Sequence, residues 1–338
     1  MRLRDYVVRR LLLIIPVLIG VTVITFALVY MVPGDPARQL LGPRTTAQQV
    51  EALREQMGLN KPLYIQYGRY LSRLLHGDLG KSTLTLQPVA QDLIERFPAT
   101  FELAMISMIL ALIVSIPLGI VSATKRNRPV DHASRIFALT GVSMPIFWLG
   151  LMLLLVFYYN LHWAPSPMGR ISMAVSPPTH ITGLFILDSL LTGNWEALSS
   201  SLSHIVLPAI CLMTPTLAMV TRMMRSSMLE VLGQDYVKTA RAKGLAEKTV
   251  IYKHAARNAL LPTTTIVGLQ FGIMFAGAVL TETIFAWPGM GRYAVEAIMY
   301  HDNAGIMGFT LVVALIFILV NLIVDLLYGV LDPRVRYG

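Results

Sequence analysis

Residues 11 to 34 read LLLIIPVLIGVTVITFALVYMVPG, an uncharged run of 24 residues. An α-helix rises about 1.5 Å per residue, so about 20 apolar residues cross about 30 Å of hydrocarbon. Backbone groups in lipid have no water to bond to, and the run lacks the alternating pattern of barrel strands. Five more uncharged runs follow, at 103–124, 136–169, 197–221, 258–281 and 303–324. Each run predicts one membrane-spanning helix, and the long run at 136–169 also holds a loop that starts near His162.

The composition agrees with a membrane protein. Of the 338 residues, 55% are hydrophobic and 14% are charged, whereas ordinary soluble domains are about 25% charged. These values exclude a water-soluble globular protein and a disordered chain. A single cysteine, Cys211, excludes a disulfide framework and a multi-thiolate metal site. The apolar part of run 11–34 is too long for an export signal, so we expect it to be retained as a helix.

Basic residues predict the orientation. Six spans place both termini on one side, and that side carries 18 of the 28 Lys and Arg residues, with a net charge of +12. The other side has ten basic and ten acidic residues and is nearly neutral. Because basic residues concentrate on the cytoplasmic side of membrane proteins, we expect both termini to be cytoplasmic.

The predicted fold is an all-α membrane protein with six transmembrane helices in three parts. Residues 1–34 form an N-terminal tail and the first span, residues 35–98 an external cap, and residues 99–338 a core with the other five spans. Within the cap, Thr45 to Met57 has helical spacing and is ended by Gly58. The core includes an external loop at 165–200, whose apolar run from Ile181 to Leu191 is too short to span, and a cytoplasmic hairpin at 225–262.

Catalytic and cofactor motifs are weak in this sequence. Residues 77–82 read GDLGKS, but a phosphate-binding Walker A loop needs a glycine where Leu75 stands, so we predict a turn in the cap. The seven histidines never fall three or four residues apart, and no serine lies in a G-x-S-x-G turn. We therefore assign no catalytic residue, no metal site and no bound cofactor to this chain.

Acidic residues near the spans bear on ion-coupled transport. Glu102, Glu282 and Asp325 are predicted at helix ends, as interfacial anchors or caps. None lies at the predicted midplane, where a proton or sodium relay would need a carboxylate. This placement argues against a stand-alone secondary transporter or channel, which remains the alternative from another functional class. A membrane receptor or scaffold is a third class.

Small residues recur every four positions in the run at 258–281. Gly268, Gly272 and Ala276 share one face, with Gly277 beside them. Small residues at this spacing let helices approach closely, which favours tight packing within the membrane. The same face is also a candidate lining for a pathway that opens and closes, and the spacing alone does not separate these interpretations.

The most informative segment is residues 234–262, QDYVKTARAKGLAEKTVIYKHAARNALLP. Asp235 is a predicted N-cap, Tyr236, Val237 and Ala240 form one apolar face, and Gly244 ends the helix. A second helix is expected from about Ala246 until Pro262. The pattern predicts a short basic hairpin at the membrane surface, which binds either anionic lipid or a cytosolic partner.

This segment resembles the coupling loop of the permeases of ABC importers, whose general pattern is E-A-A-x-x-x-G. Lys238, Thr239 and Ala240 stand where E-A-A would, and Gly244 matches the glycine. The forms TARAKG and HAARNALLP are similar to the B-type permease of the dipeptide, oligopeptide and nickel branch of the binding-protein-dependent transport permeases. Further similar stretches are PGDP at 33–36, HGDLG at 76–80, PAT at 98–100, MPIFW at 144–148, RSSMLE at 225–230, TETIF at 281–285, WPG at 287–289 and DLLY at 325–328.

The resemblance implies a type I ABC importer permease fold in the cytoplasmic, or inner, membrane of a prokaryote. It implies half of a pathway for short peptides, with nickel, glutathione or an oligosaccharide as alternative cargo. The implied partners are a second permease subunit that is a distinct paralogue, two cytosolic ATPases that bind ATP and Mg²⁺, an extracytoplasmic substrate-binding protein and the lipid bilayer, with no nucleic acid. The implied ATPase-coupling residues are Asp235, Tyr236, Lys238, Thr239, Ala240, Arg241, Lys243 and Gly244, and the pathway candidates are Gly268, Gly272, Ala276 and Gly277.

Overall fold

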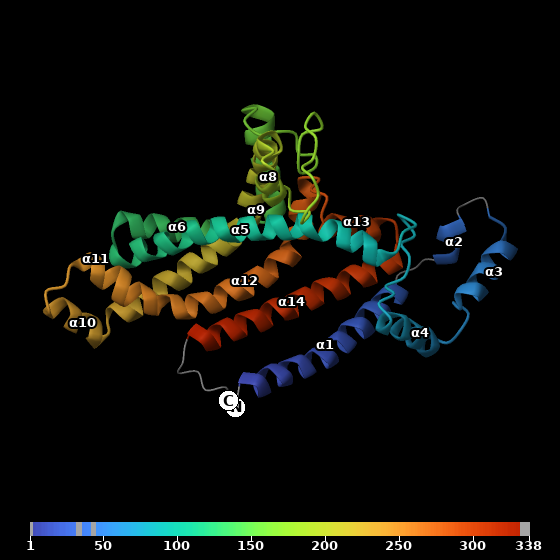
Figure 1. Ribbon diagram of the computed structural model, residues 1–338, viewed down its shortest axis with the longest axis horizontal. Helices are drawn as coiled ribbons and strands as arrows, with labels where there is room; N and C mark the ends of the chain where they lie inside the picture. The colour runs from blue at the N-terminus through green and yellow to red at the C-terminus, as the bar shows by residue number, and fades with distance from the viewer. Residues whose placement is uncertain (1–2, 32–35, 42–44, 332–338) are drawn as a thin grey trace.

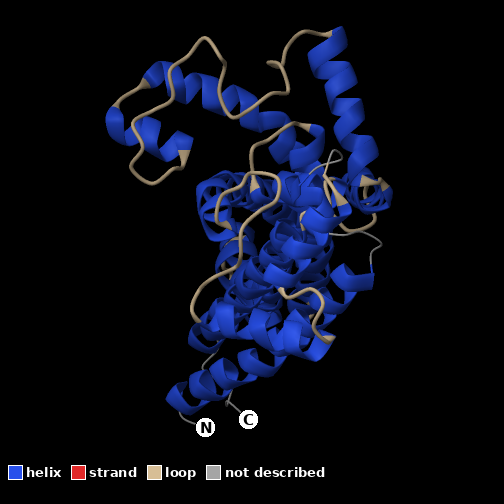
Figure 2. Cartoon of the chain, turned by 90° about the vertical axis from the view of Figure 1, so that its right-hand side faces the viewer, coloured by secondary structure: helices blue, strands red, loops and turns tan. Residues whose placement is uncertain are grey.

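The computed structural model describes residues 3–31, 36–41 and 45–331, and the regular structure of these residues is helical (Figures 1 and 2). Five of the described helices are long and apolar enough to cross a membrane. They are α1 (Leu3–Met31), α5 (Val89–Thr124), α9 (Trp195–Leu232), α12 (Arg257–Ile284, preceded by α11 and η2) and α14 (Asn303–Leu331). Shorter helices are α2 (Pro36–Leu41), α3 (Ala47–Met57), α4 (Leu63–Leu75), α6 (Pro129–Ser143), α7 (Ile146–Leu153), η1 (Leu154–Asn160), α8 (Phe185–Thr192), α10 (Asp235–Ala242), α11 (Glu247–Thr249), η2 (Val250–Ala256) and α13 (Met290–Met299).

The third predicted span is broken. Within and before the run 136–169, α6 and the pair α7–η1 meet at an angle of 105°. Pro145 is the N-cap of α7, and the residue before it, Met144, has extended backbone angles, as the ring of a following proline favours. The prediction of one spanning helix in this run holds if the bent pair counts as one span, and the described chain then has six candidate spans.

Two helices extend well beyond their uncharged runs. Helix α5 begins at Val89, 14 residues before Leu103, and its 36 residues measure about 54 Å. Helix α9 has 38 residues and continues past the charged Arg222 to Leu232. Both helices exceed the hydrocarbon thickness, so their ends project beyond it. The boundary expected between residues 98 and 99 lies inside α5.

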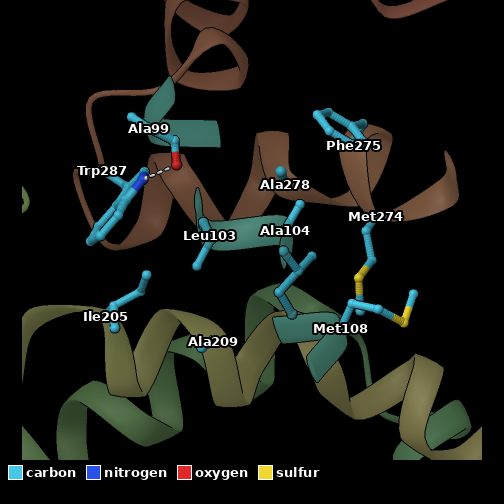
Figure 3. Close-up of a cluster of buried hydrophobic side chains, with 11 residues drawn as sticks. Ala99, Leu103, Ala104, Met108, Ile205, Ala209, Met274, Phe275, Ala278 and Trp287 are labelled. Atoms are coloured by element: carbon cyan, nitrogen blue, oxygen red, sulfur yellow. Dashed lines mark hydrogen bonds between the residues drawn. The ribbon is translucent and has the colours of Figure 1, made fainter. Parts of the chain in front are cut away.

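The core lies where α5, α9 and α12 pack together. Figure 3 shows its buried side chains, in which alanines alternate with larger residues: Ala99, Leu103, Ala104 and Met108 from α5, Ile205, Ala209 and Leu212 from α9, Met274, Phe275 and Ala278 from α12, and Trp287. The Trp287 indole donates a hydrogen bond to the Ala99 carbonyl at 2.9 Å. Trp287, which lies outside the uncharged runs, is thus part of the core.

The cap contains the predicted helix ended by Gly58. Thr46 and Gln49 form a capping box at the start of α3, and Gly58 follows the helix with φ of +71°, a conformation that glycine adopts without steric cost. The apolar run at 181–191 forms only the eight-residue helix α8. Both observations confirm the sequence-based expectations for these segments.

The hairpin and the cap lie at opposite ends of the long axis. In Figure 1, α10 and α11 occupy one end, and α2, α3 and α4 occupy the other. Helix α1 packs against α14, and the start of α1 lies near the end of α14 in both views (Figures 1 and 2). A surface formed by α10 and a surface formed by the cap are therefore separated by the length of the helix bundle.

Candidate functional site

Helix α10 begins one residue earlier than the sequence suggests. Gln234 is the N-cap and makes no side-chain capping bond, whereas Asp235 is the first helical residue. The prediction of Asp235 as N-cap was therefore wrong. Its carboxylate instead accepts a hydrogen bond from Lys238 Nζ at 2.9 Å. An acidic residue in the first turn still interacts favourably with the helix dipole.

The apolar face of α10 packs against the helices on either side of it. Val237 and Ala240 are buried against Val250 of η2, and Val231 and Leu232 at the end of α9 cover the contact. Tyr236 differs from the expected apolar face because 45% of its surface is exposed. Its hydroxyl instead accepts a hydrogen bond from the Asn258 side-chain amide at 2.8 Å, which ties α10 to α12.

The turn after α10 is fixed by its backbone and by an ion pair. Gly244 has φ of +75°, and an added Cβ there would meet no atom within 4 Å, so backbone conformation rather than space requires glycine. Arg241 donates two hydrogen bonds to Glu247, at 2.7 and 3.2 Å. These bonds raise the pKa of the Arg241 guanidinium, and they close the turn between α10 and α11.

The second arm of the hairpin does not end at Pro262. It runs from α11 through the π-helix η2 into α12, and Pro262 lies inside α12. The prediction that proline ends this helix was wrong, since a proline within a membrane helix can be accommodated by neighbouring polar groups. The next residue, Thr263, also donates from its hydroxyl to the Ala259 carbonyl at 2.9 Å. The hairpin is therefore continuous with a candidate membrane span.

The outward face of the hairpin is polar and basic. The coupling candidates on this face are all exposed: Asp235, Tyr236, Lys238, Thr239, Arg241, Lys243 and Gly244. Ala240 is the exception, since it is buried beneath them. The structure thus brings these residues together on one short helix and its turn, held from behind by apolar contacts. Such a rigid, preformed surface is suited to docking.

Apolar contacts connect the hairpin to the helix bundle. Ala255 and Ala256 of η2 are buried with Met224 and Met228 of α9, and Ile120 of α5 joins the same cluster. A rigid displacement of α10 and η2 would therefore act on α9 and α5 as well as on α12.

A buried ion pair that the sequence did not reveal lies beside this cluster. Asp131 of α6 is fully buried and accepts two hydrogen bonds from Arg225 of α9, at 2.7 and 2.9 Å. The Ser122 hydroxyl of α5 donates to the same carboxylate at 2.6 Å. Arg225 is part of the RSSMLE stretch, so one signal was present, but its partner lies 94 residues away.

A second buried carboxylate connects helices at the cap end. Glu282 of α12 is fully buried and accepts hydrogen bonds from the Thr100 hydroxyl at 2.6 Å and from the Gly291 and Arg292 N–H groups at 2.7 and 3.1 Å. Its place near the end of α12 was predicted. The arrangement joins α5 to the N-terminus of α13, so the PAT and TETIF stretches meet.

Glu102 was wrongly predicted to lie at a helix end. It is interior to α5, because that helix begins at Val89, and it forms a buried ion pair with Arg170 at 2.5 Å. Arg170 also donates to the Gly183 carbonyl at 2.9 Å and lies 3.8 Å from the Phe185 ring centre. The pair anchors the external loop to α5. The side chain of Asp325 lies outside the described residues.

The four pathway candidates do not share one surface. An added Cβ on Gly268 would overlap Val324, and one on Gly272 would lie 2.7 Å from Phe317, so both glycines allow α14 to pack closely on α12. Ala276 is exposed, whereas Gly277 faces Leu212 and Ile146. An apolar cavity of about 330 Å³ between α5, α12 and α14 includes Gly268 alone of the four. A pathway role for these residues stays a prediction.

The GDLGKS stretch forms a turn at the start of an irregular segment, as expected. Gly77 and Gly80 have positive φ values, and no strand precedes the stretch among the described residues. Ser82 donates to Asp302 at 2.5 Å, and the Thr83 N–H donates to the same carboxylate at 3.1 Å. These bonds attach the segment to the start of α14.

Comparison with known proteins places nearly the whole chain in one family. Residues 115–337 match the family described as binding-protein-dependent transport system inner membrane component, and residues 3–104 match its N-terminal membrane component. The dipeptide transport system permease protein DppB of Alkalihalophilus pseudofirmus is 48% identical over 98% of this chain and 99% of its own length. The probable D,D-dipeptide transport system permease protein DdpB of Escherichia coli K12 is 50% identical over 95% of this chain and 94% of its own. The glutathione transport system permease protein GsiC of Escherichia coli O6:H1 is 39% identical over 98% and 99%.

Proposed function

The chain belongs to the family of binding-protein-dependent transport system inner membrane components, and we propose that it forms half of the pathway by which an ATP-driven importer carries short peptides into the cell. It is a multi-pass permease component of a peptide ABC importer. The proposal of a short-peptide substrate rests on one observation. The chain is 44 to 50% identical, over nearly its full length, to permeases named for dipeptide transport.

Glutathione is the second candidate substrate. A permease named for glutathione transport also aligns over nearly the full chain, at the lower identity of 39%. Dipeptides and glutathione share peptide bonds and charged ends, so the two candidates differ in size and side-chain chemistry. Direct competition between a labelled dipeptide and glutathione would separate them.

The proposed assembly has this chain beside a second, distinct permease subunit, with two cytosolic ATPases and an extracytoplasmic substrate-binding protein. The fold would be that of a type I importer permease, with both termini cytoplasmic. The excess of basic residues at the end that holds α10 supports this orientation. ATP and Mg²⁺ would be bound by the ATPases.

The proposed coupling site is the exposed face of α10. Its basic residues would enter a groove of one ATPase, while Val237 and Ala240 hold the helix against η2 and α9. Closure of the ATPases would then displace α10, and the continuous path from η2 into α12 would carry the movement across the membrane. Helices α9 and α5 follow through the apolar cluster at Met224 and Met228.

Reconstitution of the whole transporter in proteoliposomes tests this proposal. We expect ATP-dependent uptake of a labelled dipeptide, and we expect Lys238→Asp combined with Gly244→Glu to abolish it, since the first reverses a charge and the second strains the turn. Lys248→Asp with Lys253→Asp is the control, because both lysines are exposed outside α10. Full uptake by the first variant would refute the coupling role, and uptake by this chain alone with a proton gradient would refute the ATP-driven mechanism.

A further inference from the structure

A large groove opens at the cap end of the molecule. It has a volume of about 1050 Å³ and lies between the end of α1, α4, residues 78–86 and the start of α14. We call it the cap groove. It belongs to the end of the molecule opposite α10 (Figure 1), so it is separate from the proposed coupling site.

One wall of the cap groove is α4, which an aromatic cluster holds against α1. The Phe26 ring of α1 lies 4.3 Å from the Tyr30 ring, 5.3 Å from the Tyr67 ring and 6.1 Å from the Tyr70 ring, measured between centroids. The Tyr30 hydroxyl donates to Gln66 at 2.5 Å. The opposite wall is held by Ser82 and Asp302 through the bonds described above. Both walls are therefore fixed in place.

The cap groove carries unneutralised positive charge. Arg69 and Arg73 lie one turn apart on α4, Lys81 lies on the facing segment, and all three are exposed. Among the described residues, none of the three has a carboxylate partner. Asp78 is the one acidic residue that lines the groove, and its Oδ1 already accepts a hydrogen bond from the Gly80 N–H at 2.8 Å. A cleft with a net positive charge attracts anionic groups.

We propose that the cap groove binds an acidic segment of the extracytoplasmic substrate-binding protein. The identity of this partner rests on the proposed function. The volume is at the upper limit of about 1,000 Å³ for pockets that enclose small ligands, and three cations on two facing walls match several carboxylates better than the single carboxylate of a small peptide. An extended chain segment with two or more Asp or Glu residues supplies that match. Docking there would also act on α14, because Asp302 accepts hydrogen bonds both from Ser82 in the groove and from the Gly305 N–H of α14.

The test measures the affinity of the substrate-binding protein for the complete transporter in neutral-lipid nanodiscs. Arg69→Glu with Arg73→Glu should raise the dissociation constant about tenfold at moderate salt, since two attractive contacts become repulsive. It should also weaken the dependence of binding on salt concentration. The control is Arg38→Glu with Lys61→Glu, which makes the same change in net charge at two exposed cap residues that do not line the groove. Basal ATP hydrolysis should be unchanged in both variants.

Several outcomes would overturn the inference. An unchanged dissociation constant in the groove variant would do so, and so would an equal rise in both variants, which would reflect net charge alone. A difference seen only with phosphatidylglycerol in the nanodisc would assign the groove to anionic lipid, and loss of direct binding of a free dipeptide would assign it to substrate. Peptide uptake by the unmodified transporter is scored separately, so failure of the proposed function is distinguished from failure of the groove.

Discussion

Glu282 shows how one residue can join three helices. Its carboxylate accepts hydrogen bonds from the Thr100 hydroxyl and from two N–H groups at the start of α13. Gly289 and Gly291 lie so close to this carboxylate that a side chain at either position would collide with it. An added Cβ on Gly289 would overlap the carboxylate, and one on Gly291 would lie 2.9 Å from it. The WPG stretch therefore permits close approach of the backbone to this carboxylate.

Removal of this carboxylate should destabilise the protein. Glu282→Ala leaves buried donors without partners, at a cost of about 1 to 3 kcal/mol for each, whereas Glu282→Gln keeps one acceptor oxygen and should lose less. Glu196→Ala, at an exposed position on α9, is the control. The melting temperature of the purified chain in detergent measures the effect, and equal values for Glu282→Ala and Glu196→Ala would contradict the role given to Glu282.

Asp188 gives the external loop a dependence on pH. Burial alone would raise the pKa of this carboxyl, but hydrogen bonds from the Thr182 hydroxyl and from the N–H groups of Ile181, Thr182 and Gly183 outweigh burial and lower the pKa. A lowered pKa means that the stabilisation is complete above about pH 4, the ordinary value for Asp, and is lost as the pH falls below it. The protection of the amides of residues 181–183 against hydrogen exchange, measured relative to their intrinsic exchange rates, should fall in that range. Asp188→Asn should remove this pH dependence of the protection. A pH dependence that persists in Asp188→Asn would assign the effect to another group.

Single residues differed in how far the sequence revealed them. The left-handed positions Gly58 and Gly244 were predicted, because helix-ending glycines have a local signature. The N-cap at Gln234 and the partners of Glu102 and Asp131 were not, because an ion pair between helices leaves no mark on the spacing of either one.

At the scale of elements, uncharged runs located the spans but not their lengths. Helix α5 begins before its uncharged run and includes charged residues. Two of them, Asp92 and Arg96, form an ion pair at 2.7 Å, so these charges do not end the helix. The break before α7 had a visible signal in Pro145, yet a proline also occurs within the unbroken helix α12. Only packing decides which proline ends a helix, and packing is not readable from a single sequence.

The contact between α12 and α14 separates packing from a pathway role. Gly272→Leu should destabilise the protein by about 1 to 3 kcal/mol, because the new side chain would overlap Phe317. Gly20→Leu is the control, since an added Cβ on that glycine of α1 meets no atom within 4 Å. If Gly272 serves packing, melting temperature and peptide uptake should fall together. Loss of uptake at an unchanged melting temperature would instead favour the pathway role.

At the scale of the whole molecule, one helix connects the hairpin to the buried site around Glu282. Helix α12 has 28 residues and measures about 42 Å, continuous with η2 behind α10 and carrying Glu282 near its other end. Asp131 and Arg225 brace α6 against α9 near the hairpin. Displacement of α10 can therefore reach Glu282 and the start of α13 without a flexible connection, provided that α10 stays attached to η2.

This requirement predicts that the buried face of α10 controls coupling. Val237→Asp places an unpaired charge against Val250 and Ala240, which should detach α10 because burying an unpaired charge is costly. The number of peptides transported per ATP hydrolysed should then fall at least about tenfold, while assembly with the ATPases is checked by co-purification. Tyr252→Asp is the matched control, since it makes the same type of change on the same hairpin at a residue that is 60% exposed. An assembled Val237→Asp transporter with normal stoichiometry would show that movement of α10 reaches the bundle by another route.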